Sequence, residues 1–280
     1  MLLRLAAMAL GTTLICTQDI AAFAEDSRAQ NDLVGPVRTV TTKSQGRSHT
    51  EIYNEAGHLI RAMIFVEHEQ STTLYQFVRD QHGTLREEIA SDLDGTPVYR
   101  KRFAYTYDSQ GRETAAVAAS SEKGQLHHAT FTSYDRQGHI AESLVVTDTT
   151  AQRNIFDVLG HVIYSAHFKN GDMFSEVRHA YDREGRLGEL TSYNAAGAMT
   201  GRLANEYDAS GRRVRTTTEK FHAGNGSTWI TTYEHDAMGN WIKEFMSDGT
   251  PTSQDSEEAR RYAVQERAIE YYDSPDTKTP

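Results

Sequence analysis

Tyr107-Asp108-Ser109-Gln110-Gly111 and Tyr134-Asp135-Arg136-Gln137-Gly138 are two copies of a short motif that recurs along most of this sequence. The motif consists of an aromatic residue, Asp or Asn, two variable residues and Gly. Further copies begin at Tyr53, Phe156, Tyr181, Tyr193 and Tyr207, and two copies that lack the aromatic residue begin at Arg79 and His235. Such recurrence is typical of a repeat protein, in which one supersecondary unit is stacked many times.

Each copy of the motif predicts a tight hairpin turn. The Asp or Asn side chain can accept a hydrogen bond from the backbone N–H two residues later, which closes an Asx-turn. The Gly can then adopt the left-handed conformation that leads the chain into the next strand through a bulge. We therefore assign a structural role in turns to Gly57, Gly83, Gly111, Gly138, Gly160, Gly185, Gly197, Gly211 and Gly239.

The spacing of the turns predicts the topology. Eight of these glycines, all but Gly197, are 22 to 28 residues apart, and a second turn signal such as Asp94-Gly95 or Asn170-Gly171 lies between neighbours. Turns about every 13 residues should alternate between two edges and join roughly 18 strands of ordinary length. The sequence thus predicts an all-β, continuous antiparallel meander. Because open sheets rarely exceed about ten strands without curling, we expect a curled sheet or a partial shell.

The recurring Tyr-Asp-x-x-Gly-Arg/His unit resembles the YD repeats of rearrangement-hotspot (RHS) proteins and of the animal teneurins. The resemblance extends over residues 33–272, which we take as one β domain. It implies a β-sheet that spirals into a hollow shell and a protein that is exported or displayed on cells. In bacteria, the family's shells often enclose a toxin.

Three features depart from the toxin-enclosing members of that family. The chain is much shorter than their closed shells, and it lacks their Asp-Pro-x-Gly-Leu self-cleavage motif. It also ends soon after the last repeat, with no room for a toxin domain. The resemblance therefore implies repeat architecture and export for this chain, without a toxin.

The first residues predict export. Arg4 precedes a mostly apolar run at residues 5–16, and Ala22-Phe23-Ala24 matches the small-x-small pattern that signal peptidase cleaves after. We expect a signal peptide at 1–24, a linker at 25–32, a secreted or periplasmic mature protein, and a flexible tail at 273–280. Two alternatives are a buried first strand or helix and a lipoprotein anchored through Cys16.

Composition excludes several classes of function. Cys16 is the single cysteine and would be lost with the signal peptide, so we expect no disulfide and no thiolate site. The net charge of −10 argues against nucleic-acid binding. The apolar run is shorter than the roughly 20 residues that span a bilayer, so we expect no transmembrane segment in the mature chain.

No motif indicates a catalytic, cofactor or metal site. The sequence has no nucleophile elbow, phosphate loop or dinucleotide fingerprint. Of the 12 histidines, His127 and His128 are the only adjacent pair, and those at 58, 139 and 161 each follow a turn glycine. A carboxylate pair formed between distant strands, as in a glycoside hydrolase, stays open as an enzymatic alternative.

The residue after each turn glycine is the most suggestive candidate for ligand contact. Residues with the same offset in each repeat should form a column along one sheet edge, about 10 Å apart. We assign a possible ligand-contact column to His58, Arg112, His139, His161, Arg186 and Arg212. A parallel column of Asp and Asn lies beside it, so the alternative is a solvated edge whose charges pair locally.

The sequence therefore predicts an exported, non-enzymatic binding or structural module at the cell envelope. Its partner is unknown, with a polysaccharide or an envelope protein as the expected classes. One alternative is a reduced RHS-type shell that works with a toxin-delivery or secretion partner. Another is an enzyme such as a carboxylate-based hydrolase.

Overall fold

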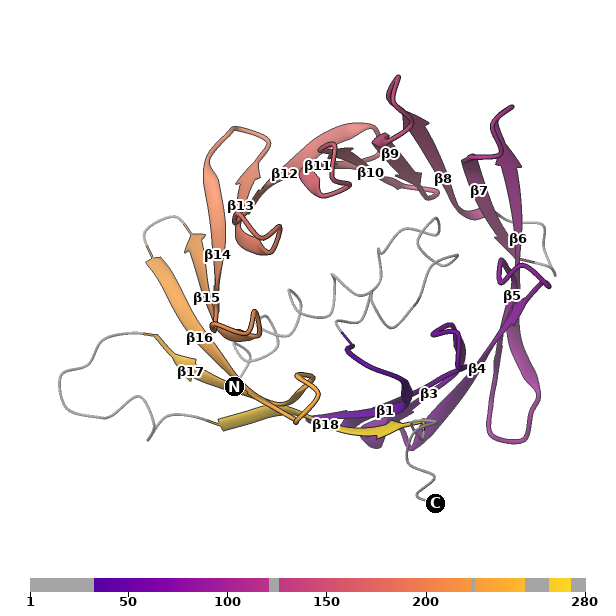
Figure 1. Ribbon diagram of the computed structural model, residues 1–280, viewed down its shortest axis with the longest axis horizontal. Helices are drawn as coiled ribbons and strands as arrows, with labels where there is room; N and C mark the ends of the chain where they lie inside the picture. The colour runs from indigo at the N-terminus through magenta and orange to yellow at the C-terminus, as the bar shows by residue number, and fades with distance from the viewer. Residues whose placement is uncertain (1–32, 121–125, 223–224, 250–261, 273–280) are drawn as a thin grey trace, which may run out of the picture.

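The computed structural model describes residues 33–120, 126–222, 225–249 and 262–272 (Figure 1). Within these ranges the chain is almost entirely β-structure, with one turn of 3-10 helix at Glu67–Glu69. The strands are β1 Val37–Ser44, β2 Arg47–Tyr53, β3 Leu59–Val66, β4 Ser71–Arg79, β5 Leu85–Ser91, β6 Pro97–Tyr107, β7 Glu113–Ser120, β8 Leu126–Tyr134, β9 Ile140–Val146, β10 Thr150–Phe156, β11 Val162–Lys169, β12 Asp172–Tyr181, β13 Leu187–Asn194, β14 Met199–Tyr207, β15 Arg213–His222, β16 Asn225–His235, β17 Trp241–Asp248 and β18 Tyr262–Tyr271. The predicted all-β meander of about 18 antiparallel strands is confirmed.

The sheet closes on itself, so the expectation of a curled sheet or partial shell was wrong. Each strand pairs with its neighbours in the chain, and β1 pairs with both β2 and β18. The result is an 18-stranded barrel (Figure 1). The spacing of the turns predicts the number of strands. It does not predict that the first strand pairs with the last, because that contact joins residues more than two hundred positions apart. Barrels of this strand number leave a wide lumen.

The hairpin turns divide between two rims, as the spacing predicted. Eight turns of the repeat motif, at residues 54–57, 80–83, 108–111, 135–138, 157–160, 182–185, 208–211 and 236–239, lie on one rim, which we call the repeat rim. At all eight hairpins the pairing register shifts next to the turn, as a β-bulge requires. The copy that begins at Tyr193 connects β13 to β14 and lies on the opposite rim.

Most of the buried side chains on the strands lie on one face of the sheet, which we assign to the inside of the ring, while Ala129, Ala166 and Ser247 are buried on the other face. Inward-facing side chains crowd together as a sheet curves, whereas outward-facing ones spread apart. The registers place the following buried residues on this inner face: Val40, Ala62, Ala90, Phe103, Ala116, Ala118, Thr130, Thr132, Ser143, Asn154, Ser165, Thr216 and Thr231. The outer face carries ion pairs across strands, including Arg153 with Glu142 and Arg202 with Glu189.

The two ends of the described chain meet at the β1–β18 seam. β1 begins at Val37, four residues into the predicted β domain, and it pairs along most of its length with the second half of β18. Leu33, Val37, Val40, Tyr53 and Leu59 form a buried cluster against Ile269 and Tyr271. The predicted signal peptide 1–24, linker 25–32 and tail 273–280 lie outside the described residues. Of the helices in the described ranges, none is long and apolar enough to cross a membrane.

Candidate functional site

The repeat rim is built from turns of one geometry. In the turn after β6, one carboxylate oxygen of Asp108 accepts the backbone N–H groups of Gln110 and Arg112 at 2.8 and 3.0 Å. The backbone of Asp108 also exchanges hydrogen bonds with Gly111 and Arg112. All nine glycines assigned to turns have φ between +77° and +95°. Each carboxylate or amide of the Asp/Asn column is thereby held by its own turn.

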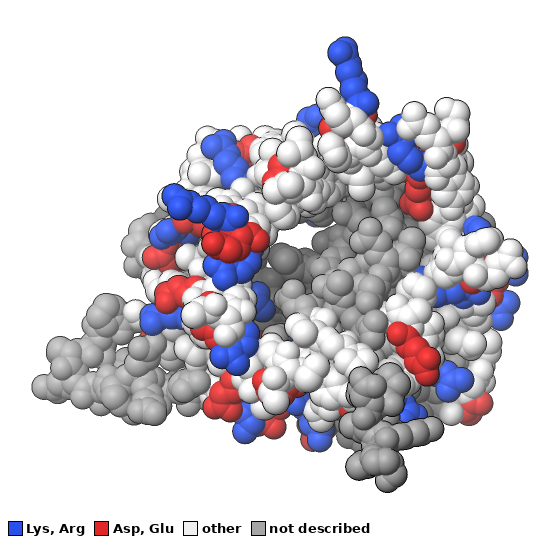
Figure 2. Space-filling model, viewed as in Figure 1, with Lys and Arg blue, Asp and Glu red and all other residues white. Residues whose placement is uncertain are grey.

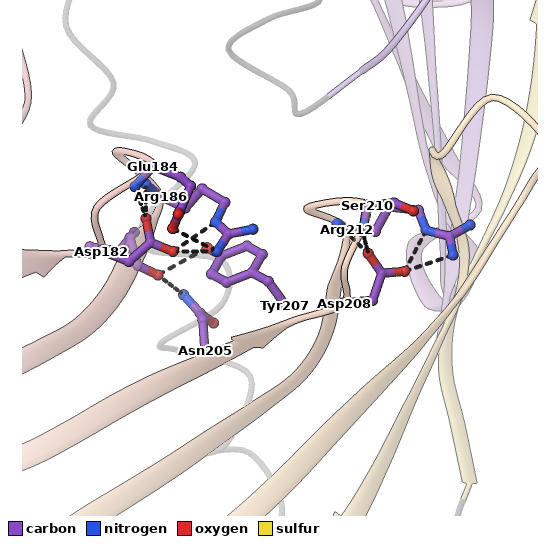
Figure 3. Close-up of polar contacts among 9 residues, drawn as sticks. Asp182, Glu184, Arg186, Asn205, Tyr207, Asp208, Ser210 and Arg212 are labelled. Carbon is purple, nitrogen blue, oxygen red and sulfur yellow. Dashed lines mark hydrogen bonds and ion pairs between the residues drawn. The ribbon is translucent and has the colours of Figure 1, made fainter.

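Five of the six residues of the predicted column bind the second oxygen of the Asp in their own turn, whereas the turn of His58 has Asn54 in place of Asp. Arg112, Arg186 and Arg212 each donate from Nε to the Asp four residues earlier at 2.7 Å. His139 and His161 place Nδ1 at 3.1 and 3.0 Å from their Asp partners. Figure 3 shows two neighbouring copies, Asp182 with Arg186 and Asp208 with Arg212.

These contacts favour the ionised carboxylates. The backbone N–H and then the side chain of Arg212 hold the pKa of Asp208 below its ordinary value. The backbone N–H of Arg112 is the main cause of the same lowering at Asp108. The rim should therefore keep its paired charges in mildly acidic solution.

The column also joins each hairpin to the next one. The Arg112 guanidinium lies 4.4 Å from the ring centre of Tyr134, and Arg186 lies 4.6 Å from that of Tyr207. The imidazole of His161 stacks on Tyr181 at 4.5 Å. In each case the ring belongs to the motif of the following repeat, so Tyr, Asp and the basic residue act together between repeats.

The tyrosines of the motif also connect neighbouring repeats through hydrogen bonds. Tyr134, Tyr181 and Tyr207 donate their hydroxyl protons to the main-chain carbonyls of Glu113, Val162 and Leu187 at 2.7, 2.9 and 2.9 Å. Each acceptor is the second residue after the turn glycine of the preceding repeat, and Tyr207 can be seen beside Arg186 in Figure 3. The five paired residues of the predicted ligand column thus form structural contacts, and their side chains are 25 to 49% exposed.

The lumen wall of β3 to β7 alternates large and small side chains. One row across the strands reads Ala62, Tyr75, Ala90 and Tyr99, and the next strands pair Phe103 with Ala118 and Tyr105 with Ala116. Aromatic rings on the even-numbered strands flank these alanines, of which Ala90, Ala116 and Ala118 are 0% exposed. We call this wall the aromatic arc.

One carboxylate in the aromatic arc is already neutralised. Glu88 accepts hydrogen bonds from the Tyr99 hydroxyl at 2.6 Å and from the Lys101 ammonium at 2.9 Å. Lys101 also lies 5.0 Å from the centre of the Tyr99 ring. The arc therefore presents rings and a paired charge to the lumen.

The wall of β8 to β11 is polar instead. Thr132, Ser143, Asn154 and Ser165 are direct cross-strand neighbours in a single row. Asn154 donates to Ser143 at 3.2 Å and accepts from Ser165 at 2.8 Å. With Thr130 these residues are 0 to 8% exposed, and we call them the hydroxyl–amide arc. Within the described part of the chain, the hydroxyls of Thr130 and Thr132 have no hydrogen-bond partner.

Glu113 departs from the repeat pattern. It is the second residue after its turn glycine, where Leu59, Leu85 and Leu187 stand in other repeats. One of its carboxylate oxygens is buried without a hydrogen-bond partner among the described residues. Burial raises the pKa of Glu113 to about 7.

We expect Glu113→Gln to stabilise the barrel at pH 8. The ionised carboxylate is disfavoured in the folded state, so wild-type stability should fall as pH rises from about 4.5 to about 7. The gain in unfolding free energy should be about 1–2 kcal/mol at pH 8, after allowance for the partial exposure of the group. Urea unfolding at both ends of this pH range measures it, and a gain that is equal at pH 4 and pH 8 would contradict the assignment.

The hydrolase alternative requires two carboxyl groups that converge on one point. Burial raises the pKa of Glu113 and of Glu244, which makes them the candidate acids. They lie on β7 and β17, which are on opposite sides of the ring (Figure 1). This pair therefore does not form such a site.

The described residues give no sign of a metal centre. In the ranges that the structure covers, no three His, Asp or Glu side chains are placed to share an ion. Burial, with a smaller effect of Lys101, lowers the pKa of His128 to about 4, so this imidazole stays neutral.

Comparisons with known proteins identify no family for this chain. No protein-family model and no curated protein matches the sequence. Among solved structures, a porin-like protein of Bacteroides uniformis aligns with 85% of this chain and 99% of its own length, at 11% identity and a TM-score of 0.45.

Two further matches come from toxin complexes. The Tc holotoxin pore of Photorhabdus luminescens aligns at 10% identity and a TM-score of 0.27, and a TcdB2–TccC3–Cdc42 complex at 11% and 0.28. Both alignments cover 83% of this chain but only 16% of the other, so this chain spans about a sixth of their length. None of the three supplies a function, and the resemblance to YD repeats continues to rest on the sequence motif.

Proposed function

We propose that this chain is an exported, non-enzymatic binding module whose lumen receives an extended, uncharged polar polymer such as a polysaccharide. The observation that carries the proposal is the two-sided lumen wall. Aromatic faces on one arc can pack against the C–H faces of sugar rings, and the hydroxyl–amide arc can hydrogen-bond to sugar hydroxyls. Charge adds specificity, because a protein of net charge −10 repels an anionic polymer.

The unpartnered hydroxyls of Thr130 and Thr132 support the same proposal. A buried hydroxyl without a partner costs free energy, and a polar guest that displaced the atoms covering these two hydroxyls would supply the missing hydrogen bonds. The opening is visible in Figure 2, where acidic and basic side chains are mixed around the ring. Ion pairs on the outer face suit a wall immersed in water.

The test is a binding screen with neutral and anionic polysaccharides. The chain has two tryptophans, and the registers place Trp229 on the inner face, so tryptophan fluorescence reports on the lumen. We expect a neutral polymer such as dextran to change the fluorescence. Thr132→Val should weaken the binding several-fold without destabilising the fold, because the variant removes only an unpartnered hydroxyl.

The matched control replaces the rim cations. A variant with Arg112, Arg186 and Arg212 changed to Ser should bind the neutral polymer as wild type does. If instead an anionic polymer bound, more strongly below about pH 6 and not at all to this variant, the binding site would be the ligand-contact column on the rim and not the lumen. Binding of an unfolded polypeptide in place of any polysaccharide would favour the alternative, a shell that works with a toxin-delivery partner.

A further inference from the structure

One hairpin tip of the repeat rim is apolar. The two residues between the Asp or Asn and the Gly form the bend of each turn, and in the turn between β10 and β11 they are Val158 and Leu159. These residues are 68 and 76% exposed, and Leu159 is the most exposed large apolar residue in the described part of the chain. Two aliphatic side chains therefore stand in water at the end of one hairpin.

The fold does not require apolar side chains at this bend. The turn is held by Asp157, which accepts the backbone N–H groups of Leu159 and His161 at 2.9 Å. Six of the seven other turns of the repeat rim have at least one polar residue at the bend. In the seventh, Met238 packs over Gly35 beside the seam. Apolar surface that the fold does not use and that polar residues surround is typical of an interaction site.

An arginine lies at the bend of the turn on each side of this tip. Arg136 is in the turn between β8 and β9, Arg183 is in the turn between β12 and β13, and both are exposed. Within the described part of the chain, neither guanidinium forms an ion pair or a hydrogen bond. Neighbouring turns of the rim are two strands, or about 10 Å, apart. The three tips thus present an apolar group between two unpaired cations.

The carboxylates of the same three turns are already bound. Asp135, Asp157 and Asp182 each accept two backbone N–H groups and contact the basic side chain of their own turn. Glu184 lies 3.2 Å from Arg186 (Figure 3). The net charge of −10 on the whole chain acts weakly here, because salt screens charges that are more than about 8 Å apart.

We propose that these three tips dock on the surface of a phospholipid bilayer. Val158 and Leu159 enter the boundary of the acyl chains, and Arg136 and Arg183 bind headgroup phosphates, which fit the planar donors of a guanidinium. A protein partner fits less well, because a specific interface buries about 800 Å² on each side and the apolar contact here is limited to two side chains. The proposal concerns the rim and does not depend on the function proposed for the lumen.

The experiment is flotation of the full chain with vesicles of phosphatidylcholine and phosphatidylglycerol in equal parts. Changing Val158→Ser and Leu159→Ser together should lower the partition into lipid about tenfold or more, because two apolar side chains no longer leave water. Changing Arg136→Ser and Arg183→Ser should lower it about fivefold per arginine. Circular dichroism should be the same for all variants, since every change is at an exposed bend. Equal partition of wild type and the Val158/Leu159 variant would overturn the proposal.

A fluorescent probe separates insertion of this tip from lipid binding elsewhere on the chain, including the apolar run at residues 5–16. Leu159→Cys, with Cys16 changed to Ser, accepts an environment-sensitive dye, and Ser210→Cys places the dye at the same bend position two turns away. We expect vesicles to shift the emission to the blue at position 159 and to leave it unchanged at position 210. Equal shifts at both positions would contradict docking through this tip. A shift at position 159 without vesicles would indicate contact between proteins and would also overturn the proposal.

Discussion

Replacing Asn240 by Ala is expected to lower the free energy of unfolding by about 2–4 kcal/mol, because a fully buried amide that makes three hydrogen bonds is removed. Asn240 is 0% exposed, and its side chain accepts the Val34 N–H at 2.6 Å and donates to the Val34 carbonyl at 2.9 Å. It also donates to the Tyr271 hydroxyl at 2.7 Å. One amide therefore holds the entry to β1 and the end of β18.

The matched control is Thr84→Ala, which has the same offset in another repeat. Thr84 is bound to its turn through its backbone N–H, which Ala retains, so a loss of less than about 0.5 kcal/mol is expected. Urea unfolding measures both variants. Hydrogen exchange should also become faster in β1 and β18 of the Asn240 variant. Equal losses at the two positions would show that Asn240 has no special role at the seam.

Replacing Gly185 by Val should have the second large effect. Gly185 has φ +79°, a region that a β-branched residue strongly disfavours, and its added Cβ would lie 3.2 Å from His161. Backbone strain of this kind costs about 1–3 kcal/mol, and the contact with His161 should bring the loss to the upper part of that range.

Gly160→Val separates the two contributions. Gly160 has φ +86° with nothing within 4 Å of an added Cβ, so its variant should show the backbone strain alone. Val at Gln137 or Ser210, two exposed bend positions, should cost much less. If all four variants lost the same stability in denaturant unfolding, the turn assignment would be wrong.

The strand count was predictable because each turn has a local signal. The Asp carboxylate and the Gly of each motif lie within four residues of one another, so every hairpin can be found without knowledge of its neighbours. Closure has no local signal. It consists of the pairing of β1 with β18, and Asn240, which contacts Val34 206 positions away beside that seam, looks in the sequence like any other polar residue of the column.

The candidate sites were predictable only in part. The adjacency of Asp108 and Arg112 follows from their shared turn, and the sequence indicated it. The contact of Arg112 with Tyr134 joins two hairpins and requires the bulged register, which the motif does not define. The row from Thr132 to Ser165 also depends on register across four strands. Alignment of the repeats could have revealed Leu159 and Glu113, since each breaks the pattern at its position.

The most direct test of the closed barrel is a disulfide across the seam. Thr41 on β1 and Ala268 on β18 are paired in the register, so cysteines at these positions, with Cys16 changed to Ser, should cross-link within one chain. A control pair at Thr41 and Ala204 joins strands on different sides of the ring and should not react. We predict near-complete formation of the Thr41–Ala268 disulfide in monomeric protein, seen by mass spectrometry after mild oxidation. Failure to form the bond, or its formation only between two chains, would contradict closure of the barrel.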